Sequence, residues 1–271
     1  MTGKRLIEEI NNCVLSEKQV AFWWIGQSGV AIKTANKIIY LDLYISKNNI
    51  RRFPPLLAPE EIDNADLIFG SHDHLDHIDR KAWPIIAKVS KKAKFIVPGL
   101  LVKELSNDLG IAYERFVTIG DKQLVNLGKV KITGIASAHE MLDYDPATGK
   151  YPYMGFVIEI GDFVIYHSGD TCIYEGLENK LRGWNRIDIM FLPINGRDAF
   201  RLRNGIVGNM TYQEAVDLAG RLKPRLVVPT HYDMFSGNLE NPGLFADYMD
   251  SKFKGQKYWI GNAGEKVIVD S

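Results

Sequence analysis

Short apolar runs recur along the chain, and glycine, asparagine and proline separate them from one another. Near the beginning, Leu6, Ile7 and Ile10 have helical spacing and predict a short amphipathic helix. The runs that follow are typical of strands, because they are short and bounded by turn residues. They predict strands over residues 20–25, 30–33, 37–43, 67–69, 95–97, 122–126, 129–136, 154–160, 163–167, 187–192, 226–228, 258–260 and 266–269.

Helices are predicted between many of these strands, over residues 80–90, 100–109, 174–181, 212–222 and 244–253. Thr211 and Glu214 form a T-x-x-E capping box at the start of the fourth of these helices. The elements thus follow the order β-rich, β/α, β-rich, β/α. This order predicts an α/β fold, a four-layer αβ/βα sandwich with two facing mixed sheets and helices outside. No linker separates the halves, so we expect one domain over residues 1–271.

Composition and charge exclude several classes of protein. With 46% apolar residues, the chain of 271 residues can fill a large core, which excludes a disordered chain. Its 33 basic and 33 acidic residues balance, which argues against a polybasic nucleic-acid module. No run reaches about 18 apolar residues, as a membrane span would require. Two cysteines are too few for a disulfide framework, and Glu8 and Glu9 interrupt any export signal, so we expect a cytoplasmic protein.

The most informative motif is S-H-D-H-L-D-H over residues 71–77, which holds three of the six histidines. From composition, H-x-H-x-D-H would arise by chance in about 2 of 10⁴ such chains. In an extended segment, His72 and His74 project to the same side and can bind one cation. A turn into the next helix would bring Asp76 and His77 to a second cation. The alternative is a solvated polar turn whose aspartates cap that helix.

Three further candidate ligands, His139, Asp170 and His231, each follow a predicted strand. A lone histidine at a strand end is more often a hydrogen-bonded structural residue. Together with the histidine motif, however, the three predict that four strand ends meet along one edge of the sandwich. His167 lies on the opposite strand face from Asp170, so we expect a structural role for it. Asp42 either orients a ligand histidine or faces a turn.

The H-x-H-x-D-H motif, a later histidine, the aspartate of S-G-D-T and a final histidine together resemble the motif set of the metallo-β-lactamase superfamily. The resemblance covers essentially the whole chain, and the set is highly specific for that fold. It implies two metal ions, the first held by His72, His74 and His139, the second by Asp76, His77 and His231, with Asp170 as the bridge between them.

Three more segments are similar to the L-ascorbate-6-phosphate lactonase group: W-I-G-Q-S-G, P-I-N-G-R-D and G-N-M-T. This similarity implies a lactonase-like hydrolase with manganese, whereas the wider superfamily implies zinc. Five imidazoles and two carboxylates without a thiolate exclude neither ion. Oxygen-reducing di-iron relatives usually carry glutamate at the position of His74, so the resemblance favours hydrolysis. We therefore expect two divalent metal ions per chain, Mn²⁺ or Zn²⁺.

A dinuclear centre lowers the pKa of bound water toward about 7 and polarises a carbonyl or phosphoryl oxygen. We therefore predict catalytic roles for Asp76 and Asp170. Asp233 and Tyr232 follow the last candidate ligand and are candidates for proton transfer, substrate binding or support of the ligands. Ordinary polar residues at a strand end are an equal alternative for both.

The segment over residues 194–210 is long for a connection between a strand and a helix. On it, Arg197 can clamp a phosphate or carboxylate with its two-pronged guanidinium, and Asn195 lies beside it in the sequence. We predict that both residues bind substrate. The alternative is a solvated loop or a subunit contact.

The leading hypothesis is a metal-dependent hydrolase that uses the hydroxide of a dinuclear site on a small anionic ester or lactone, with a sugar-phosphate lactone first. The first alternative is a phosphodiesterase or ribonuclease on the same metal site. The second is a non-catalytic regulator that binds metal or nucleic acid. The balanced charge argues against a nucleic-acid partner, and we expect no membrane partner. The sequence leaves a homo-oligomer open.

Overall fold

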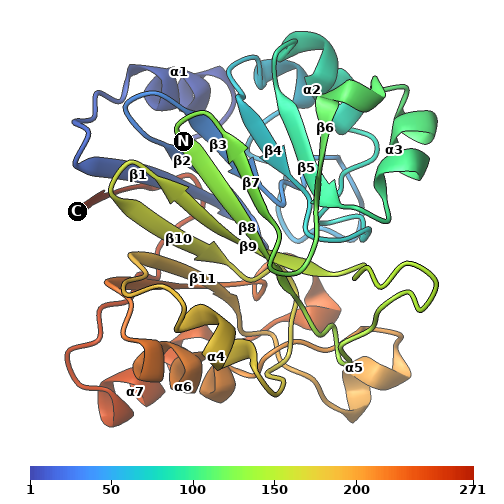
Figure 1. Ribbon diagram of the computed structural model, residues 1–271. Coiled ribbons are helices and arrows are strands. Elements are labelled where there is room, and N and C mark those ends of the chain that lie inside the picture. Colours follow the sequence, from blue (N-terminus) through green and yellow to red (C-terminus); the bar gives the residue numbers. More distant parts are fainter.

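Two β-sheets face each other through the middle of the molecule, and helices cover both outer faces (Figure 1). The computed structural model describes residues 1–271. The first sheet has seven strands in the order β13-β1-β2-β3-β4-β5-β6. Their bounds are β1 (Gln19–Gly26), β2 (Gly29–Lys33), β3 (Ile38–Leu41), β4 (Leu67–Phe69), β5 (Lys94–Pro98), β6 (Phe116–Ile119) and β13 (Lys266–Asp270).

The second sheet has six strands in the order β12-β11-β10-β9-β8-β7. Their bounds are β7 (Leu124–Leu127), β8 (Val130–Ala136), β9 (Met154–Ile160), β10 (Phe163–His167), β11 (Ile189–Pro193) and β12 (Leu226–Thr230). Both sheets are mixed, because β3 to β6 and β10 to β12 pair in parallel while the remaining neighbours pair antiparallel. The predicted four-layer sandwich of two facing mixed sheets is therefore confirmed.

Strand β1 shows how the sequence produces the layers. Phe22 and Trp24 belong to the core between the sheets, and the ring of Phe22 packs edge-on against Phe191 of β11 at 5.4 Å between centroids. Trp23 and Ile25 point the opposite way, into the core beneath the helices. Successive side chains of a strand alternate between faces, so a strand that is apolar throughout is buried on both sides.

Helices α1, α2 and α3 lie over the first sheet, and α4, α6 and α7 lie over the second, while α5 is set apart beside the edge of the sandwich (Figure 1). Three short 3₁₀ turns join other segments, at Pro59–Glu61, Tyr113–Arg115 and Ser236–Asn238. The helices are α1 (Lys4–Asn12), α2 (Trp83–Val89), α3 (Val102–Leu109), α4 (Leu177–Leu181), α5 (Ala199–Arg203), α6 (Tyr212–Leu222) and α7 (Pro242–Lys252).

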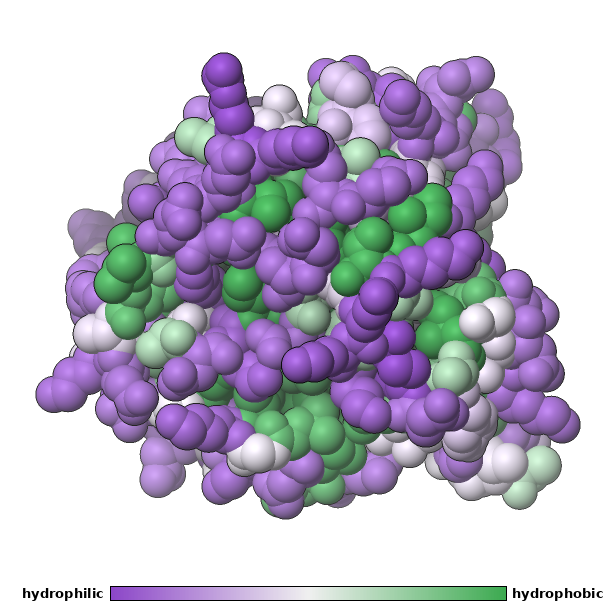
Figure 2. Space-filling model, turned by 90° about the horizontal axis from the view of Figure 1, so that it is seen from above, coloured by the Kyte–Doolittle hydropathy of each residue, from purple (hydrophilic) through white to green (hydrophobic).

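The outer surface over α1, α2 and α3 is mostly hydrophilic, with separate hydrophobic patches between the polar side chains (Figure 2). None of the helices combines the length and the apolar character that crossing a bilayer requires. Helix α6 begins at the predicted capping box. The Thr211 hydroxyl accepts from the Glu214 backbone N–H at 3.3 Å, and the Glu214 carboxylate accepts from the Thr211 backbone N–H at 2.9 Å.

Three elements differ from the sequence prediction. Strand β6 was not predicted, although it pairs in parallel with β5 at the edge of the first sheet. Residues 258–260 form no strand, because Tyr258 makes only an isolated bridge to Val227. Helix α5 was expected to be part of a loop, and it begins where the Asp198 side chain accepts from the Arg201 backbone N–H. The single-domain interpretation stays a prediction.

Candidate metal centre

Four strands, one from the first sheet and three from the second, end at the same edge of the sandwich. Strand β4 leads into the histidine motif, and β8, β10 and β12 lead to His139, Asp170 and His231. Each of three groups has its ligand atoms within 4.8 Å of one another: His72, His74 and His139; His72, His77 and Asp170; and Asp76, His77 and His231. The structure therefore brings together all seven residues expected to be ligands. Their binding of metal stays a prediction.

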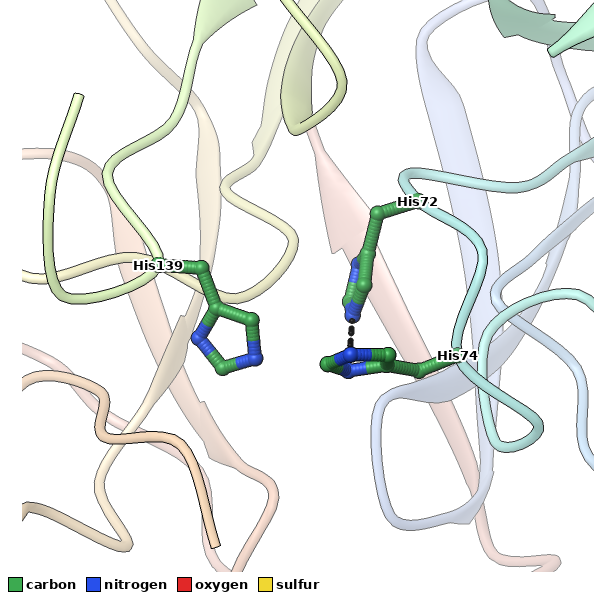
Figure 3. A group of neighbouring side chains, drawn as sticks. All are labelled: His72, His74 and His139. Carbon is green, nitrogen blue, oxygen red and sulfur yellow. Dashed lines mark hydrogen bonds between the residues drawn. The ribbon is translucent and has the colours of Figure 1, made fainter. Parts of the chain in front are cut away.

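His72, His74 and His139 direct their rings toward a common point from opposite sides of the site (Figure 3). His72 Nε2 lies 2.9 Å from His74 Nδ1. On the far side, His139 Nδ1 donates to the Gly208 carbonyl at 3.0 Å. That bond fixes the tautomer of His139 and leaves its Nε2 free of a proton to bind a cation.

We call His72, His74 and His139 the first group, and Asp76, His77 and His231 the second group. The second group lies beside the first, and Asp170 lies between them. Asp170 Oδ1 is 3.3 Å from His77 Nε2, and its Oδ2 is 3.0 Å from His231 Nε2 and 3.8 Å from His139 Nε2. Asp76 Oδ2 lies 3.4 Å from His231 Nε2 and 3.8 Å from His77 Nε2. The carboxylate of Asp170 thus faces expected ligands of both groups, as a bridging residue must.

Asp42 lies directly beneath the site and is fully buried. Its Oδ2 accepts from His77 Nδ1 at 2.7 Å and from His167 Nε2 at 2.9 Å, and its carboxylate also accepts from the Ser71 backbone N–H and hydroxyl. Asp42 was expected either to orient a ligand histidine or to face a turn. In the structure it contacts His77, an expected ligand, and so is placed to orient that ring. His167 is a structural residue of the same network, as predicted.

A glycine allows Asp170 to reach the histidine motif. Gly169 adopts φ +57°, a backbone conformation that residues with a side chain rarely take. A Cβ at this position would lie 2.7 Å from Ser71 Cβ and 2.9 Å from the Met154 carbonyl oxygen. The chain after β10 can therefore approach the end of β4 only because residue 169 has no side chain.

The two groups of histidines differ in their electrostatics. Burial lowers the pKa of His72, His74 and His139, and for His72 the neighbouring His77 lowers it further. Burial also works against protonation of His231, yet the nearby carboxylates raise its pKa to about 9.

The same balance applies to His77. Burial would lower the pKa of His77, but the charges of Asp170, Asp42 and Asp76 together raise it well above its usual value. Burial would raise the pKa of Asp42, and the charges of His77 and His167 lower it far below its usual value. Without a cation, protons thus occupy the second group and leave the first group neutral.

The chemistry of these side chains fits divalent metal ions. His77 Nε2 and Asp170 Oδ1 are buried and have no hydrogen-bond partner, which is costly unless a ligand engages them. Imidazole suits zinc and carboxylate suits manganese, so a set of five histidines and two aspartates accepts either ion. His77 donates to the Asp42 carboxylate and His139 donates to the Gly208 carbonyl, which is the outer support that metal-binding histidines usually have.

Gln27 is a residue of the site to which the sequence analysis gave no role. Its side-chain Nε2 donates to Asp76 Oδ2 at 2.8 Å and lies 3.0 Å from His231 Nε2, and the residue is buried. It occupies the turn between β1 and β2 with φ 55°. The signal in the sequence was a long polar residue in a tight turn between glycines, where asparagine or glycine is typical.

A cavity of about 790 Å³ opens above the candidate metal ligands. His74, Asp76, His139, Asp170 and His231 form its floor. Its walls come from residues 49–50, 205–207 and 235–238, together with Asp73 and Leu75 of the histidine motif. Asp76 and Asp170, the two aspartates expected to be catalytic, therefore face the space in which a substrate would bind.

The predicted role of Arg197 in substrate binding stays a prediction, and the structure places its side chain away from the cavity. Its guanidinium donates to both carboxylate oxygens of Glu214 at 2.7 Å and to the Asn209 carbonyl at 2.9 Å, and the residue does not line the cavity. Asn195 is also absent from the cavity wall. Its side-chain Nδ2 donates to Asn238 Oδ1 at 2.9 Å, so it contacts a wall residue from behind.

Tyr232 and Asp233 also lie outside the cavity. Tyr232 is buried, and its ring stacks on Trp24 at 5.1 Å between centroids. Asp233 Oδ1 accepts from the Gln27 backbone N–H at 2.9 Å. The predicted roles of Tyr232 in substrate binding and of Asp233 in proton transfer stay predictions, and in the structure both residues contact the segment around the turn that carries Gln27.

A four-layer sandwich with histidines and aspartates gathered at one edge is an arrangement that can hold metal ions at that edge. In agreement, a family model described as "Beta-lactamase superfamily domain" matches residues 40–232. The chain therefore belongs to the metallo-β-lactamase superfamily and is a metal-dependent hydrolase.

Relatives from bacteria and archaea match along most of their length. A UPF0173 metal-dependent hydrolase from Lysinibacillus sphaericus is 34% identical over 251 residues, which cover 89% of this chain and 96% of the relative. A UPF0173 metal-dependent hydrolase from Pyrococcus horikoshii is 28% identical, covering 91% of this chain and 94% of the relative. Among solved structures, Igni18, a metallo hydrolase from Ignicoccus hospitalis, shares the fold with a TM-score of 0.73 at 21% identity, covering 93% of this chain and 99% of that one.

Proposed function

We propose that this metal-dependent hydrolase cleaves a small ester or lactone at a dinuclear centre of Mn²⁺ or Zn²⁺. The observation that carries the proposal is the convergence of seven histidine and aspartate side chains, six of them buried, at one edge of the sandwich, where five of them form the floor of a cavity. The first ion would be held by His72, His74 and His139, the second by Asp76, His77 and His231, and Asp170 would face both.

When bound, two divalent cations supply a water of lowered pKa and polarise the carbonyl that is attacked. The chain itself provides orientation. Asp42 holds His77 through its Nδ1, and the Gly208 carbonyl holds His139 in the same way. Gln27 donates to Asp76 and thereby fixes which carboxylate oxygen turns toward the cavity. Asp170, on the cavity floor, is placed to accept a proton from the attacking water.

The test is hydrolysis of a panel of lactones and esters by protein stripped of metal and then reloaded with Mn²⁺ or Zn²⁺. We expect no turnover without metal and turnover on reloading. His74→Ala should abolish turnover and lower the metal content, because it removes one ligand of the first ion. Full turnover by His74→Ala would contradict the proposal.

The phosphodiesterase alternative has less support. Phosphodiester recognition depends on basic side chains, and no lysine or arginine lines the cavity. The lactonase-like resemblance remains the source of the proposed reaction, but the same lack of basic side chains gives a sugar phosphate no partner besides the metal ions. If the protein is a regulator without activity, the metal-loaded protein should hydrolyse none of the lactones and esters in the panel.

A further inference from the structure

The walls of the cavity carry a clear chemical preference. Five apolar side chains line it: Ile50, Leu75, Ile206, Val207 and Phe235. The only charged wall residue besides the metal-binding floor is Asp73, and its carboxylate is paired with Arg80 at 2.5 Å. A charged substituent would have to give up its water in this cavity without finding a charged partner on the wall.

The floor attracts an anionic substituent less strongly than its two ligand aspartates alone would suggest. The carboxylate of Asp42 lies against His77, so it adds a third negative charge to those of Asp76 and Asp170. Arg197, the cation expected to bind an anion, is held by Glu214. The positive charge of two bound metal ions would therefore be opposed by three carboxylates, Asp42, Asp76 and Asp170, and not only by the two that are expected ligands.

One wall residue offers a fixed hydrogen-bond donor. Asn238 Oδ1 accepts from Asn195 Nδ2 at 2.9 Å and from Arg201 Nε at 3.2 Å, and two donors on one atom identify it as the oxygen. Asn209 Nδ2 in turn donates to Asn195 Oδ1 at 3.0 Å, which orients the neighbouring amide. Asn238 lines the cavity and is 8% exposed, while its Nδ2 makes no hydrogen bond within the protein. That N–H₂ group is available to a carbonyl or ring oxygen.

We propose that the cavity selects an uncharged ester or lactone, whose apolar substituent packs on the five apolar wall residues and whose oxygen accepts from Asn238 Nδ2. The inference rests on the proposed hydrolase function and adds the substrate class. Its second part assigns the Asn195–Asn209–Asn238 network as the device that orients the substrate, which explains the asparagines at 195 and 209 in the P-I-N-G-R-D and G-N-M-T segments.

The experiment compares two γ-lactones with the same ring, one bearing a butyl group and the other a carboxylate, on the metal-loaded protein. We expect kcat/KM to be at least about 10-fold higher for the butyl lactone. A preference for the carboxylate lactone would overturn the inference and leave the hydrolase function intact. If neither lactone reacts, the wider panel of lactones and esters decides the hydrolase proposal. Calorimetric binding of the two corresponding tetrahydrofurans then decides the inference, because tighter binding of the butyl compound supports it and tighter binding of the carboxylate overturns it.

Two sets of variants locate the effect. Ile206→Arg adds a cation to the cavity wall and should shift the preference toward the carboxylate lactone by about 10-fold. Leu202→Arg is the matched control, because Leu202 is 68% exposed on α5 and does not line the cavity. An equal shift in both variants would contradict a role for the wall.

Asn238→Ala should lower kcat/KM for the butyl lactone by up to about 10-fold, mainly through KM, because one hydrogen bond to the bound substrate is lost. Asn238→Asp should lower it further, since a carboxylate repels the carbonyl oxygen. Unchanged kinetics in Asn238→Ala would remove Asn238 from the proposal, provided that its circular dichroism spectrum and its metal content match those of the unaltered protein.

Discussion

Asp42 is a buried carboxylate that contacts one expected ligand of the second metal ion, His77. We predict that Asp42→Asn weakens binding of the second metal ion by about 10- to 100-fold. Asparagine can still accept from His77, but it carries no charge to hold the ring in the orientation that the 2.7 Å bond now fixes. Metal titration followed by elemental analysis measures the change, and we expect loss of one ion per chain before the other.

The control for Asp42→Asn is Asp188→Asn. Asp188 is equally buried and accepts from the Val164 backbone N–H at 2.9 Å, far along the sheet from the metal ligands. This variant should lose stability without losing metal affinity. If both variants lost metal to the same extent, general destabilisation would explain the result, and the orienting role of Asp42 would be wrong.

The histidines of the two groups should also differ in proton release. His77 has a raised pKa and that of His231 is about 9, so both carry a proton at pH 7 in the metal-free protein. A metal ion must displace these protons, and the affinity of the second group should therefore rise with pH up to about 9. The pKa of His72 and of His139 is lowered, so the first group should bind without releasing protons.

Calorimetry in buffers of different ionisation enthalpy separates the two events. We expect one binding event with about two protons released at pH 7 and one with about none. A heat of binding that does not depend on the buffer for either event would contradict the assignment of the charged histidines to the second group.

At the scale of the elements, the connection after β10 depends on Gly169. Gly169→Ala should lower the free energy of unfolding by about 1–3 kcal/mol, because it combines a positive φ with overlap against Ser71 and the Met154 carbonyl. Gly161→Ala is the matched control: its φ is +58°, but the nearest atom to a Cβ there is the Glu17 carbonyl oxygen at 3.7 Å. Chemical denaturation measures both, and equal losses would show that overlap plays no part.

Elements whose burial follows from their own sequence were predictable, and those that depend on a partner were not. Strands β9 and β10 and helix α6 have the predicted bounds, since each has an apolar pattern and clear turn or capping residues. Strand β6 forms because it pairs with β5. Residues 258–260 form no strand, because only Tyr258 makes a bridge to a neighbouring strand, at Val227. Local pattern does not specify either outcome.

In the whole molecule, the candidate metal ligands could be predicted from local sequence, whereas the residues that line or support the cavity wall could not. Rare histidines at strand ends carried enough chemical information to predict which residues converge. The pairing of Arg197 with Glu214 on α6 was not predicted, because a guanidinium has many possible partners and the sequence does not show which one lies nearest. Gln27 and Asn238 were missed, since their roles arise only where segments distant in sequence meet.

The candidate metal centre draws its residues from both halves of the fold. The histidine motif follows β4 of the first sheet, whereas His139, Asp170 and His231 follow strands of the second. Ions held by both sets would link the sheets at their shared edge, and a ligand that binds only the folded state stabilises it. At a free metal concentration of 100 times the dissociation constant, each ion would add about 2.7 kcal/mol to the free energy of unfolding.

We therefore predict that Mn²⁺ or Zn²⁺ raises the Tm of chelator-treated protein by about 5 °C or more, a shift that follows from this gain for a chain of this size. Thermal unfolding monitored by circular dichroism, with and without a chelator, measures it. His139→Ala removes a ligand from the second sheet and His74→Ala one from the first, so both should reduce the shift. If metal raised the Tm of these variants as much as that of the unaltered protein, the ions would bind elsewhere and the two sheets would be held together by their apolar core alone.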